Sequence, residues 1–152
     1  HPVMLGYYKK LEETAKAIDP EGWFHTGDLG LLDDRGYICF TGRLKEIFRV
    51  GGENADPVEV EALLLQHPAV SMVKVTGVPD RRLGEVGMAF VQFKPGQRAS
   101  EQELIDFCKG KIANFKVPRY VMAVDEYPMT PSGKVQKFKL REIAVERMGL
   151  EE

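Results

Sequence analysis

Runs of apolar, β-prone residues predict three strands in the second part of the chain. Each run is bounded by turn-forming residues, which is typical of strands in a small sheet. The predicted strands span residues 69–78, 85–94 and 117–124. A shorter β-prone run at residues 47–50 ends at two consecutive glycines.

Helices are predicted between these strands from apolar residues at helical spacing and from capping residues. Asp56 and Pro57, followed by Glu59, form a helix start with an aspartate cap and proline at the first helical position. Ser100 and Glu103 form a second capping box. A last helix is predicted from the apolar residues Leu140, Ile143, Ala144 and Met148. This alternation predicts an α+β domain, a small three-stranded sheet covered by helices.

The amino-terminal part of the chain has a different pattern, a short helix at residues 11–18 and then a β-hairpin. The hairpin is predicted from two β-prone runs, residues 29–32 and 37–41, which flank a turn with aspartate and glycine. Two strands alone do not make a stable domain. We therefore interpret residues 1–44 as a hinge and the end of a larger, missing domain, and residues 45–152 as a complete carboxy-terminal domain. A first residue that is histidine rather than methionine also favours a fragment.

Composition and charge narrow the function classes. Of the 152 residues, 43% are hydrophobic and 29% are charged, which is typical of a globular protein. The formal net charge of −2 produces no broad positive field, so neither a nucleic-acid partner nor a membrane surface is predicted. No apolar run reaches the roughly 18 residues of a transmembrane segment. Cys39 and Cys108 lack the spacing of a zinc site or a disulfide framework, which predicts no metal site and a cytoplasmic protein.

Asp28 and Arg43 are candidates for binding a ribose. Asp28 follows Thr26 and Gly27 at the end of a β-prone run, where a carboxylate can accept two hydrogen bonds from a diol. Arg43 follows Gly42 at the end of the predicted hairpin, where its planar set of donors can reach the same ribose or a phosphate. The alternatives are an aspartate that caps its own turn and a solvated surface arginine. Two aromatic residues that precede this aspartate are expected in the core, Trp23 and Phe24.

Lys134 is the strongest catalytic candidate. It follows Pro131, Ser132 and Gly133, and this composition predicts an extended, flexible loop. The point charge of its ammonium can neutralise both a carboxylate and the phosphate that this carboxylate must attack. The alternative is a solvated loop lysine in a basic region. That region continues with Lys137, Lys139 and Arg141.

Four stretches together resemble the motifs of the adenylate-forming superfamily, which contains acyl-CoA synthetases, peptide-synthetase adenylation domains and beetle luciferases. Residues 22–28 resemble its ribose-binding motif, residues 41–46 its linker motif and residues 129–134 its catalytic lysine motif. The Gly-Gly-Glu-Asn sequence at residues 51–54 resembles the loop of the pantetheine tunnel. The resemblance covers the whole chain, with Glu46 standing where aspartate is commoner.

The resemblance implies a role for each stretch. Asp28 and Arg43 would bind the nucleotide, Lys134 would be catalytic, and the basic residues after it would lie on the surface or near CoA phosphates. Lys45 would be the hinge about which the carboxy-terminal domain swings between two active orientations. Glycine lets the thiol arm of coenzyme A pass close to the backbone, although a glycine turn before a helix is the alternative. The residues implied in that tunnel are Gly51, Gly52 and Glu53.

The implied activity is that of an AMP-forming acid–CoA ligase. A fatty acid or another carboxylic acid reacts with ATP and Mg2+ to give an acyl-adenylate and pyrophosphate, and CoA then displaces AMP. The family's phosphate loop, adenine motif and acyl pocket would lie in the missing domain, so we expect the chain alone to be inactive. Two alternatives remain, a non-catalytic α+β binding module and an adenylation domain from another branch of the superfamily.

Overall fold

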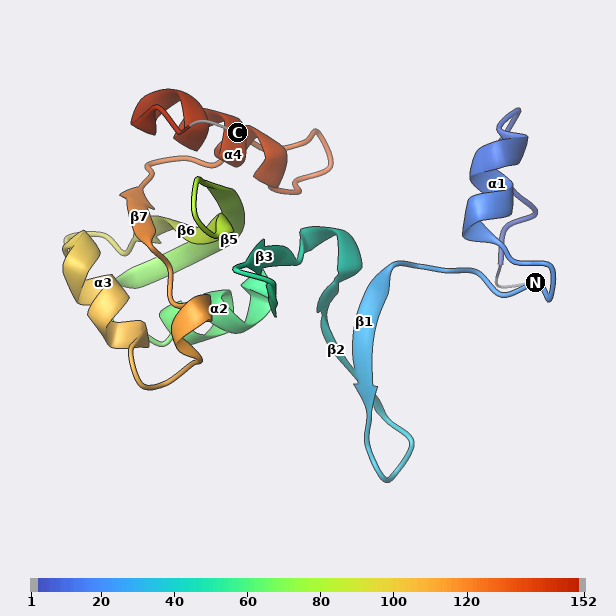
Figure 1. Cartoon of the computed structure of the whole chain (residues 1–152), viewed down its shortest axis with the longest axis horizontal. Coiled ribbons are helices and arrows are strands. Elements are labelled where there is room, and N and C mark those ends of the chain that lie inside the picture. The colour runs from blue at the N-terminus through green and yellow to red at the C-terminus, as the bar shows by residue number, and fades with distance from the viewer. Residues whose placement is uncertain (1–2, 151–152) are drawn as a thin grey trace. The chain divides into compact units, whose positions relative to one another are not determined.

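The structure is a computed structural model that describes residues 3–150. The chain divides into two compact units, and the division falls between Lys45 and Glu46. The first unit contains one helix and a hairpin, and the second contains a sheet with three α-helices (Figure 1). Each unit is described separately below.

The first unit contains the predicted helix and hairpin. Helix α1 spans Leu11–Ala17, and strands β1 (Asp28–Leu32) and β2 (Ile38–Arg43) pair in antiparallel fashion. Asp33 stabilises the turn because its carboxylate accepts the N–H groups of Arg35 and Tyr37, at 2.9 and 2.8 Å. The hairpin prediction is therefore confirmed.

The first unit has almost no hydrophobic core. Among residues 3–45, Gly42 alone is buried. Trp23 is 73% exposed and Phe24 is 37% exposed, so the expectation that they are core residues is wrong for this structure. The physical reason is that their run forms no strand, and Phe24 makes a single β-bridge, to Ile18. Large apolar side chains of the hairpin are also exposed, namely Leu31, Leu32, Tyr37, Ile38 and Phe40.

The second unit is built on one mixed sheet. Its strands lie in the order β4-β3-β6-β5, and β7 pairs with β6 in parallel. The bounds are β3 Phe48–Val50, β4 Glu53–Ala55, β5 Val70–Asp80, β6 Gly84–Phe93 and β7 Tyr120–Ala123. The α+β class is confirmed, but the predicted count of three strands is wrong, because the short strands β3 and β4 also join the sheet. Residues 86–91 are all buried, so β6 is covered on both faces.

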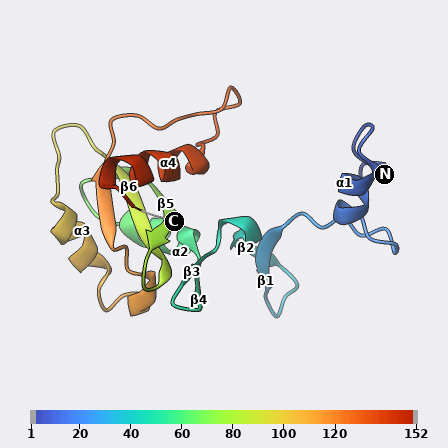
Figure 2. The ribbon, with the colours of Figure 1, turned by 45° about the horizontal axis from the view of Figure 1, so that its top comes forward.

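Three α-helices pack against this sheet. They are α2 (Pro57–Leu64), α3 (Glu101–Cys108) and α4 (Lys137–Met148), and a 3-10 turn spans Asn114–Lys116. Helix α2 contacts β5 and α3, whereas α4 contacts β5 (Figures 1 and 2). The predicted caps are present: the Asp56 carboxylate accepts the Val58 N–H at 2.9 Å, and Ser100 and Glu103 cap each other. These caps fix where α2 and α3 begin.

The core of the second unit connects the elements that carry the candidate site. Leu64 on α2, Phe90 on β6 and Leu140 on α4 are each at most 1% exposed. The Tyr127 hydroxyl, on the segment before the Lys134 motif, donates to the Phe90 carbonyl at 2.7 Å, and burial raises the pKa of Tyr127. The start of α4 and the segment before it are therefore anchored to the sheet.

Candidate functional site

Asp28 and Arg43 are brought together by the hairpin. They are directly opposite each other in the β1–β2 register, and Arg43 Nε lies 2.9 Å from Asp28 Oδ1. The Asp28 side chain is 36% exposed and that of Arg43 is 59% exposed. Because a carboxylate has two acceptor oxygens, Asp28 can pair with Arg43 and still accept from a bound hydroxyl. The pair can therefore bind a diol from the solvent side.

The backbone around this pair is fixed on both sides. Gly27 has a φ of +75°, a conformation that favours glycine, and its carbonyl accepts the Leu44 N–H at 2.9 Å. The register shifts between Leu29 and Gly30, where an added Cβ would lie 3.0 Å from Ile38 Cγ2. Pairing thus continues past Arg43 into the following turn.

Lys45 lies in the 3-10 turn Leu44–Glu46, and its side chain is exposed. This turn follows β2 and precedes β3, and it contains the division between the two units. Lys45 is therefore the last residue of the first unit.

Gly51 and Gly52 form the two-residue turn of a β-hairpin. Their φ angles are +60° and +95°, and they connect β3 to β4 rather than leading directly into a helix. A turn with two positive φ angles favours glycine at both positions, which explains these residues without a ligand. Among residues 3–150, apart from Gly52 itself and its two chain neighbours, no atom lies within 4 Å of where a Cβ would be added to Gly52. Glu53 follows as an exposed residue at the start of β4.

The turn after β5 supports this glycine hairpin. The Gly51 N–H donates to the Leu83 carbonyl at 2.8 Å, and Asp80 accepts the Leu83 N–H at 2.9 Å. That backbone hydrogen bond is the main cause that holds the pKa of the Asp80 carboxyl below its ordinary value. Asp80 also forms an ion pair at 2.5 Å with Arg119, the residue before β7. Gly51 is thus held to the sheet through Leu83.

Lys134 lies in a compact hairpin, so the expectation of an extended loop is wrong. The Thr130 N–H donates to the Lys134 carbonyl at 2.7 Å, and the Lys134 N–H donates to Thr130 Oγ1 at 3.0 Å. The hairpin closes at its base, where the Gln136 N–H donates to the Pro128 carbonyl at 2.8 Å. Lys134 is exposed, and no ion pair of its ammonium occurs within residues 3–150. The backbone is ordered by hydrogen bonds while the side chain can reach a ligand.

The sequence analysis missed the role of Lys137, which it expected on the surface or near CoA phosphates. The Lys137 ammonium donates to Glu46 at 2.7 Å and to Glu61 at 2.8 Å, and its side chain is 20% exposed. Arg141 is also partly buried, and it donates to Glu85 at 2.5 Å. A signal was present in the sequence, because Glu61 lies on the apolar face of α2 and a buried carboxylate requires a cationic partner.

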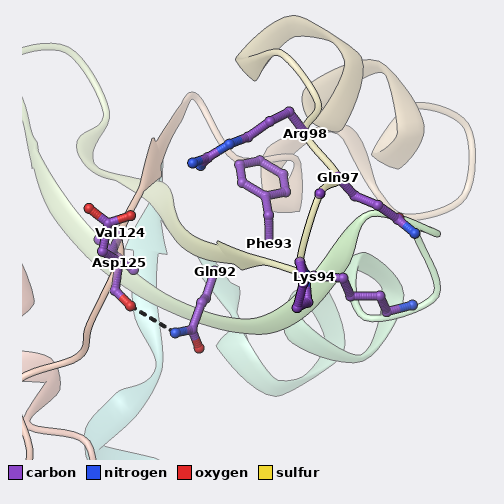
Figure 3. A pocket seen from close by; sticks show the side chains of 9 residues that line it. Gln92, Phe93, Lys94, Gln97, Arg98, Val124 and Asp125 are labelled. Carbon is purple, nitrogen blue, oxygen red and sulfur yellow. Dashed lines mark hydrogen bonds between the residues drawn. The ribbon is translucent and has the colours of Figure 1, made fainter.

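The surface pockets of the second unit include one at the end of β6 and one beside the glycine hairpin. The first has a volume of about 370 Å3, lies at the end of β6, and contains none of the predicted site residues (Figure 3). In it the Arg98 guanidinium lies over the Phe93 ring, 5.6 Å from its centroid. The second, of about 330 Å3, adjoins the glycine hairpin through Val50 and Leu83. Its other lining residues are Val86, Lys109, Asn114, Phe115, Val117 and Arg119.

In residues 3–150 no group of three or more His, Cys, Asp or Glu side chains is placed to hold a metal ion. Within the described part of the chain, no helix is both long and apolar enough to span a membrane.

Comparison with known proteins identifies the relatives of this chain. The family model described as the AMP-binding enzyme C-terminal domain matches residues 59–134. The putative acyl-CoA synthetase YngI of Bacillus subtilis is 53% identical over 97% of this chain and 27% of its own length. A 3-[(3aS,4S,7aS)-7a-methyl-1,5-dioxo-octahydro-1H-inden-4-yl]propanoyl:CoA ligase of Rhodococcus jostii is 54% identical over 92% of this chain and 27% of its own length. The chain therefore spans about a quarter of these relatives.

Solved structures of related proteins are also similar to this chain. ATP-bound MatB from Rhodopseudomonas palustris is 37% identical, with a TM-score of 0.88 over 93% of this chain and 28% of MatB. The apo form of MatB has a TM-score of 0.70 over 91% of this chain and 28% of MatB. The two forms of one protein thus differ in how well they match this chain.

Proposed function

The chain belongs to the AMP-binding enzyme C-terminal domain family, and we propose that it is the carboxy-terminal part of an AMP-forming acid–CoA ligase. It spans 27% of the length of the acyl-CoA synthetase and the CoA ligase described above. The protein in which this chain follows an adenylation domain is called the full ligase below. Its reaction is acyl-adenylate formation from a carboxylic acid and ATP, followed by transfer of the acyl group to CoA.

The single observation that carries this proposal is the presentation of Lys134. The hairpin fixes its backbone, and its exposed ammonium is available to a ligand. In adenylate formation a carboxylate attacks a phosphate, so two anions must approach each other. A positioned ammonium lowers the free energy of that transition state because it attracts both. We assign Lys134 as the catalytic residue of the first half-reaction.

We assign Asp28 and Arg43 to the nucleotide. A carboxylate and a guanidinium held 2.9 Å apart at the surface of a hairpin suit a ribose that carries a phosphate. Mg2+ would arrive with the phosphates of ATP. We assign no residue of this chain to the ion.

We place the domain boundary at residues 44–45 and the hinge at Lys45. The exposed apolar side chains of the β1–β2 hairpin support the view that residues 1–44 end a larger domain that would cover them. One active site that performs two half-reactions requires the carboxy-terminal domain to act as a lid with two orientations.

We assign the glycine hairpin to the path of CoA. The open space beside Gly52 and the adjoining pocket, which is lined mainly by apolar residues, suit a narrow thiol arm. Gly51 and Glu53 complete this hairpin.

The free thiols of Cys39 and Cys108 support a reducing compartment such as the cytoplasm.

Acid-dependent exchange of pyrophosphate into ATP tests the proposal. The full ligase should catalyse exchange with one member of a panel of carboxylic acids, fatty acids included, and should then form the acyl-CoA. The present chain alone should catalyse neither step, because most ATP contacts would lie in the other domain. Exchange by the chain alone, or no exchange by the full ligase with any acid, would contradict the proposal and favour a binding module.

A further inference from the structure

Four charged side chains form a compact cluster in the second unit. Lys137 Nζ lies 2.7 Å from Glu46 Oε2 and 2.8 Å from Glu61 Oε1. Glu61 Oε2 accepts from Lys74 Nζ at 3.1 Å, and Glu61 Oε1 also accepts the Val75 N–H at 2.9 Å. The cluster contains two carboxylates and two ammonium groups, so its formal charges balance. Lys137 is the member that contacts both carboxylates.

The cluster joins four elements that are distant in sequence. Glu46 is the last residue of the 3-10 turn and the first residue of the second unit, directly after Lys45. Glu61 is on α2, Lys74 is on β5, and Lys137 is the first residue of α4. Lys137 therefore ties the segment that follows the proposed hinge to the body of the second unit.

Burial makes this tie more than a surface ion pair. The Glu61 side chain is 9% exposed, and Lys137 is 20% exposed. Exposed ion pairs contribute little to the stability of a fold. Removal of one partner from a buried ion pair, in contrast, destabilises the fold strongly, because the remaining charge stays buried without compensation. Glu46, with 36% of its side chain exposed, could instead be solvated by water. Glu46 therefore does not need Lys137 in order to stay ionised. The contact to Lys137 instead fixes the position of the Glu46 side chain.

Lys137 also lies next to the hairpin that carries Lys134. The base of that hairpin closes at Gln136, which donates to the Pro128 carbonyl, and Lys137 follows at once. Residue 137 is thus three positions after Lys134 along the chain. The Glu46–Lys137 ion pair therefore lies directly beside the base of the hairpin that carries Lys134.

We propose that Lys137 is a positioning residue that fixes Lys134 relative to the hinge. This inference rests on the proposed function. When the lid turns about Lys45, the Glu46–Lys137 contact makes the segment after the hinge and the Lys134 hairpin move together. Without this contact the hairpin base and the hinge segment would shift relative to each other. Misplacement of a catalytic group by about 1 Å can cost about 100-fold in rate.

The two half-reactions of the full ligase test this proposal separately. Lys137→Met should reduce pyrophosphate exchange by about 100-fold, mainly in kcat. Thioester formation from supplied acyl-adenylate should change by less than about threefold, because Lys134 does not act in that step. Glu46→Gln should produce the same selective loss while Glu61 keeps both lysines, so this variant addresses the contact even if Lys137→Met folds poorly.

Two matched controls exclude a general effect of charge or stability. Lys74→Met removes the other lysine from Glu61 and leaves the Lys137–Glu46 ion pair in place. Lys139→Met removes an exposed lysine on the same helix. Both should keep pyrophosphate exchange within about threefold of wild type. In a double-mutant cycle, Glu46→Gln and Lys137→Met should be non-additive, because both remove the Glu46–Lys137 ion pair.

The outcomes separate this inference from the proposed function. Equal losses in Lys74→Met and Lys137→Met, or equal losses in both half-reactions, would show that the cluster only stabilises the fold and would overturn the inference. Wild-type exchange in a folded Lys137→Met ligase would overturn it as well. Lys134→Ala serves as the reference: if it leaves exchange intact, the proposed function fails first. If it abolishes exchange while Lys137→Met does not, only the inference fails.

Discussion

Arg43 faces Asp28 across the β1–β2 hairpin, with its Nε 2.9 Å from the carboxylate. Fifteen residues separate them in sequence, yet the strand register makes them neighbours. If this pair binds the ribose of the nucleotide, Asp28→Asn should weaken ATP binding by the full ligase. Hydrogen bonds to charged groups are worth about 1.5–3 kcal/mol, which corresponds to roughly a 10- to 150-fold higher KM for ATP.

Asp34→Asn is the matched control for this substitution, because Asp34 is an exposed carboxylate in the turn of the same hairpin. It should leave the KM for ATP unchanged. An unchanged KM in Asp28→Asn, or an equal increase in both variants, would remove Asp28 from the nucleotide site.

Lys134→Ala should separate the two half-reactions. Removal of a positioned charge should lower kcat for adenylate formation by about 100- to 1,000-fold. Thioester formation from supplied acyl-adenylate should largely persist. Stopped assays of each half-reaction measure both rates, with Lys139→Ala as the control. Equal losses in both steps would indicate a role for Lys134 in folding or general binding.

The two cysteines should differ in reactivity in the present chain. Cys39 is exposed on β2, whereas Cys108 is 0% exposed on α3, and burial raises the pKa of its thiol to about 11. Thiolate is the reactive form, so Cys108 should resist alkylation at neutral pH. Mass spectrometry after iodoacetamide treatment should find label on Cys39 in the folded chain and on both residues in denaturant. Rapid labelling of Cys108 under native conditions would show that α3 does not pack as described.

Acid should weaken the start of α3. The backbone and side chain of Ser100 donate to Glu103, at 2.7 and 2.8 Å, and hold the pKa of that carboxyl below its ordinary value of 4.5. Since the folded state favours the ionised form, its contribution to stability is present above that value and is lost as the pH falls. Glu103→Gln should therefore melt a few degrees below wild type at pH 7.

The same melting difference should shrink between pH 7 and an acid pH well below 4.5, as the Glu103 carboxyl becomes protonated. Glu146→Gln, which changes an exposed carboxylate on α4, should melt like wild type at both pH values. A Glu103→Gln difference that persists unchanged in acid would mean that the ionised carboxyl is not what stabilises the helix start.

Local features were predictable from the sequence, whereas contacts between distant residues were not. Asp56 and Ser100 cap helices through residues two or three positions away, so spacing reveals them. Strand β3 lies in the β-prone run that was recognised at residues 47–50, whereas the three-residue strand β4 shows no clear pattern. Neither was predicted as part of the sheet, which was therefore given too few strands. The Lys137–Glu46 contact spans 91 residues, and its existence depends on how α4 packs.

The candidate site, too, was predictable in its local motifs but not in its three-dimensional contacts. The motif residues are recognisable because each stretch is short, but the sequence could not tell that Lys134 lies on a hydrogen-bonded hairpin instead of an extended loop. Trp23 was expected in a core, yet among residues 3–45 the packing partners that would bury it are lacking. Whether an aromatic side chain is buried depends on the elements that pack over it. The residues next to the aromatic residue in sequence do not encode those elements.

We propose that one active site is served by two lid orientations that are related by rotation at Lys45. Lys45 lies in a 3-10 turn, whose usual φ of −50° to −70° is close to the φ of about −65° that proline imposes. Lys45→Pro should therefore fold and should hold the turn near its present torsion. It removes backbone freedom at the proposed hinge without altering Asp28, Arg43 or Lys134.

The most direct test is to measure both half-reactions of the full ligase with Lys45→Pro, after circular dichroism has shown that the variant is folded. We predict that pyrophosphate exchange is retained, while CoA-dependent release of the acyl thioester falls by orders of magnitude. Lys45→Ala, which keeps backbone freedom, should leave thioester release much closer to wild type. If a folded Lys45→Pro ligase makes acyl-CoA at the wild-type rate, rotation at Lys45 is not required and Lys45 is not the hinge.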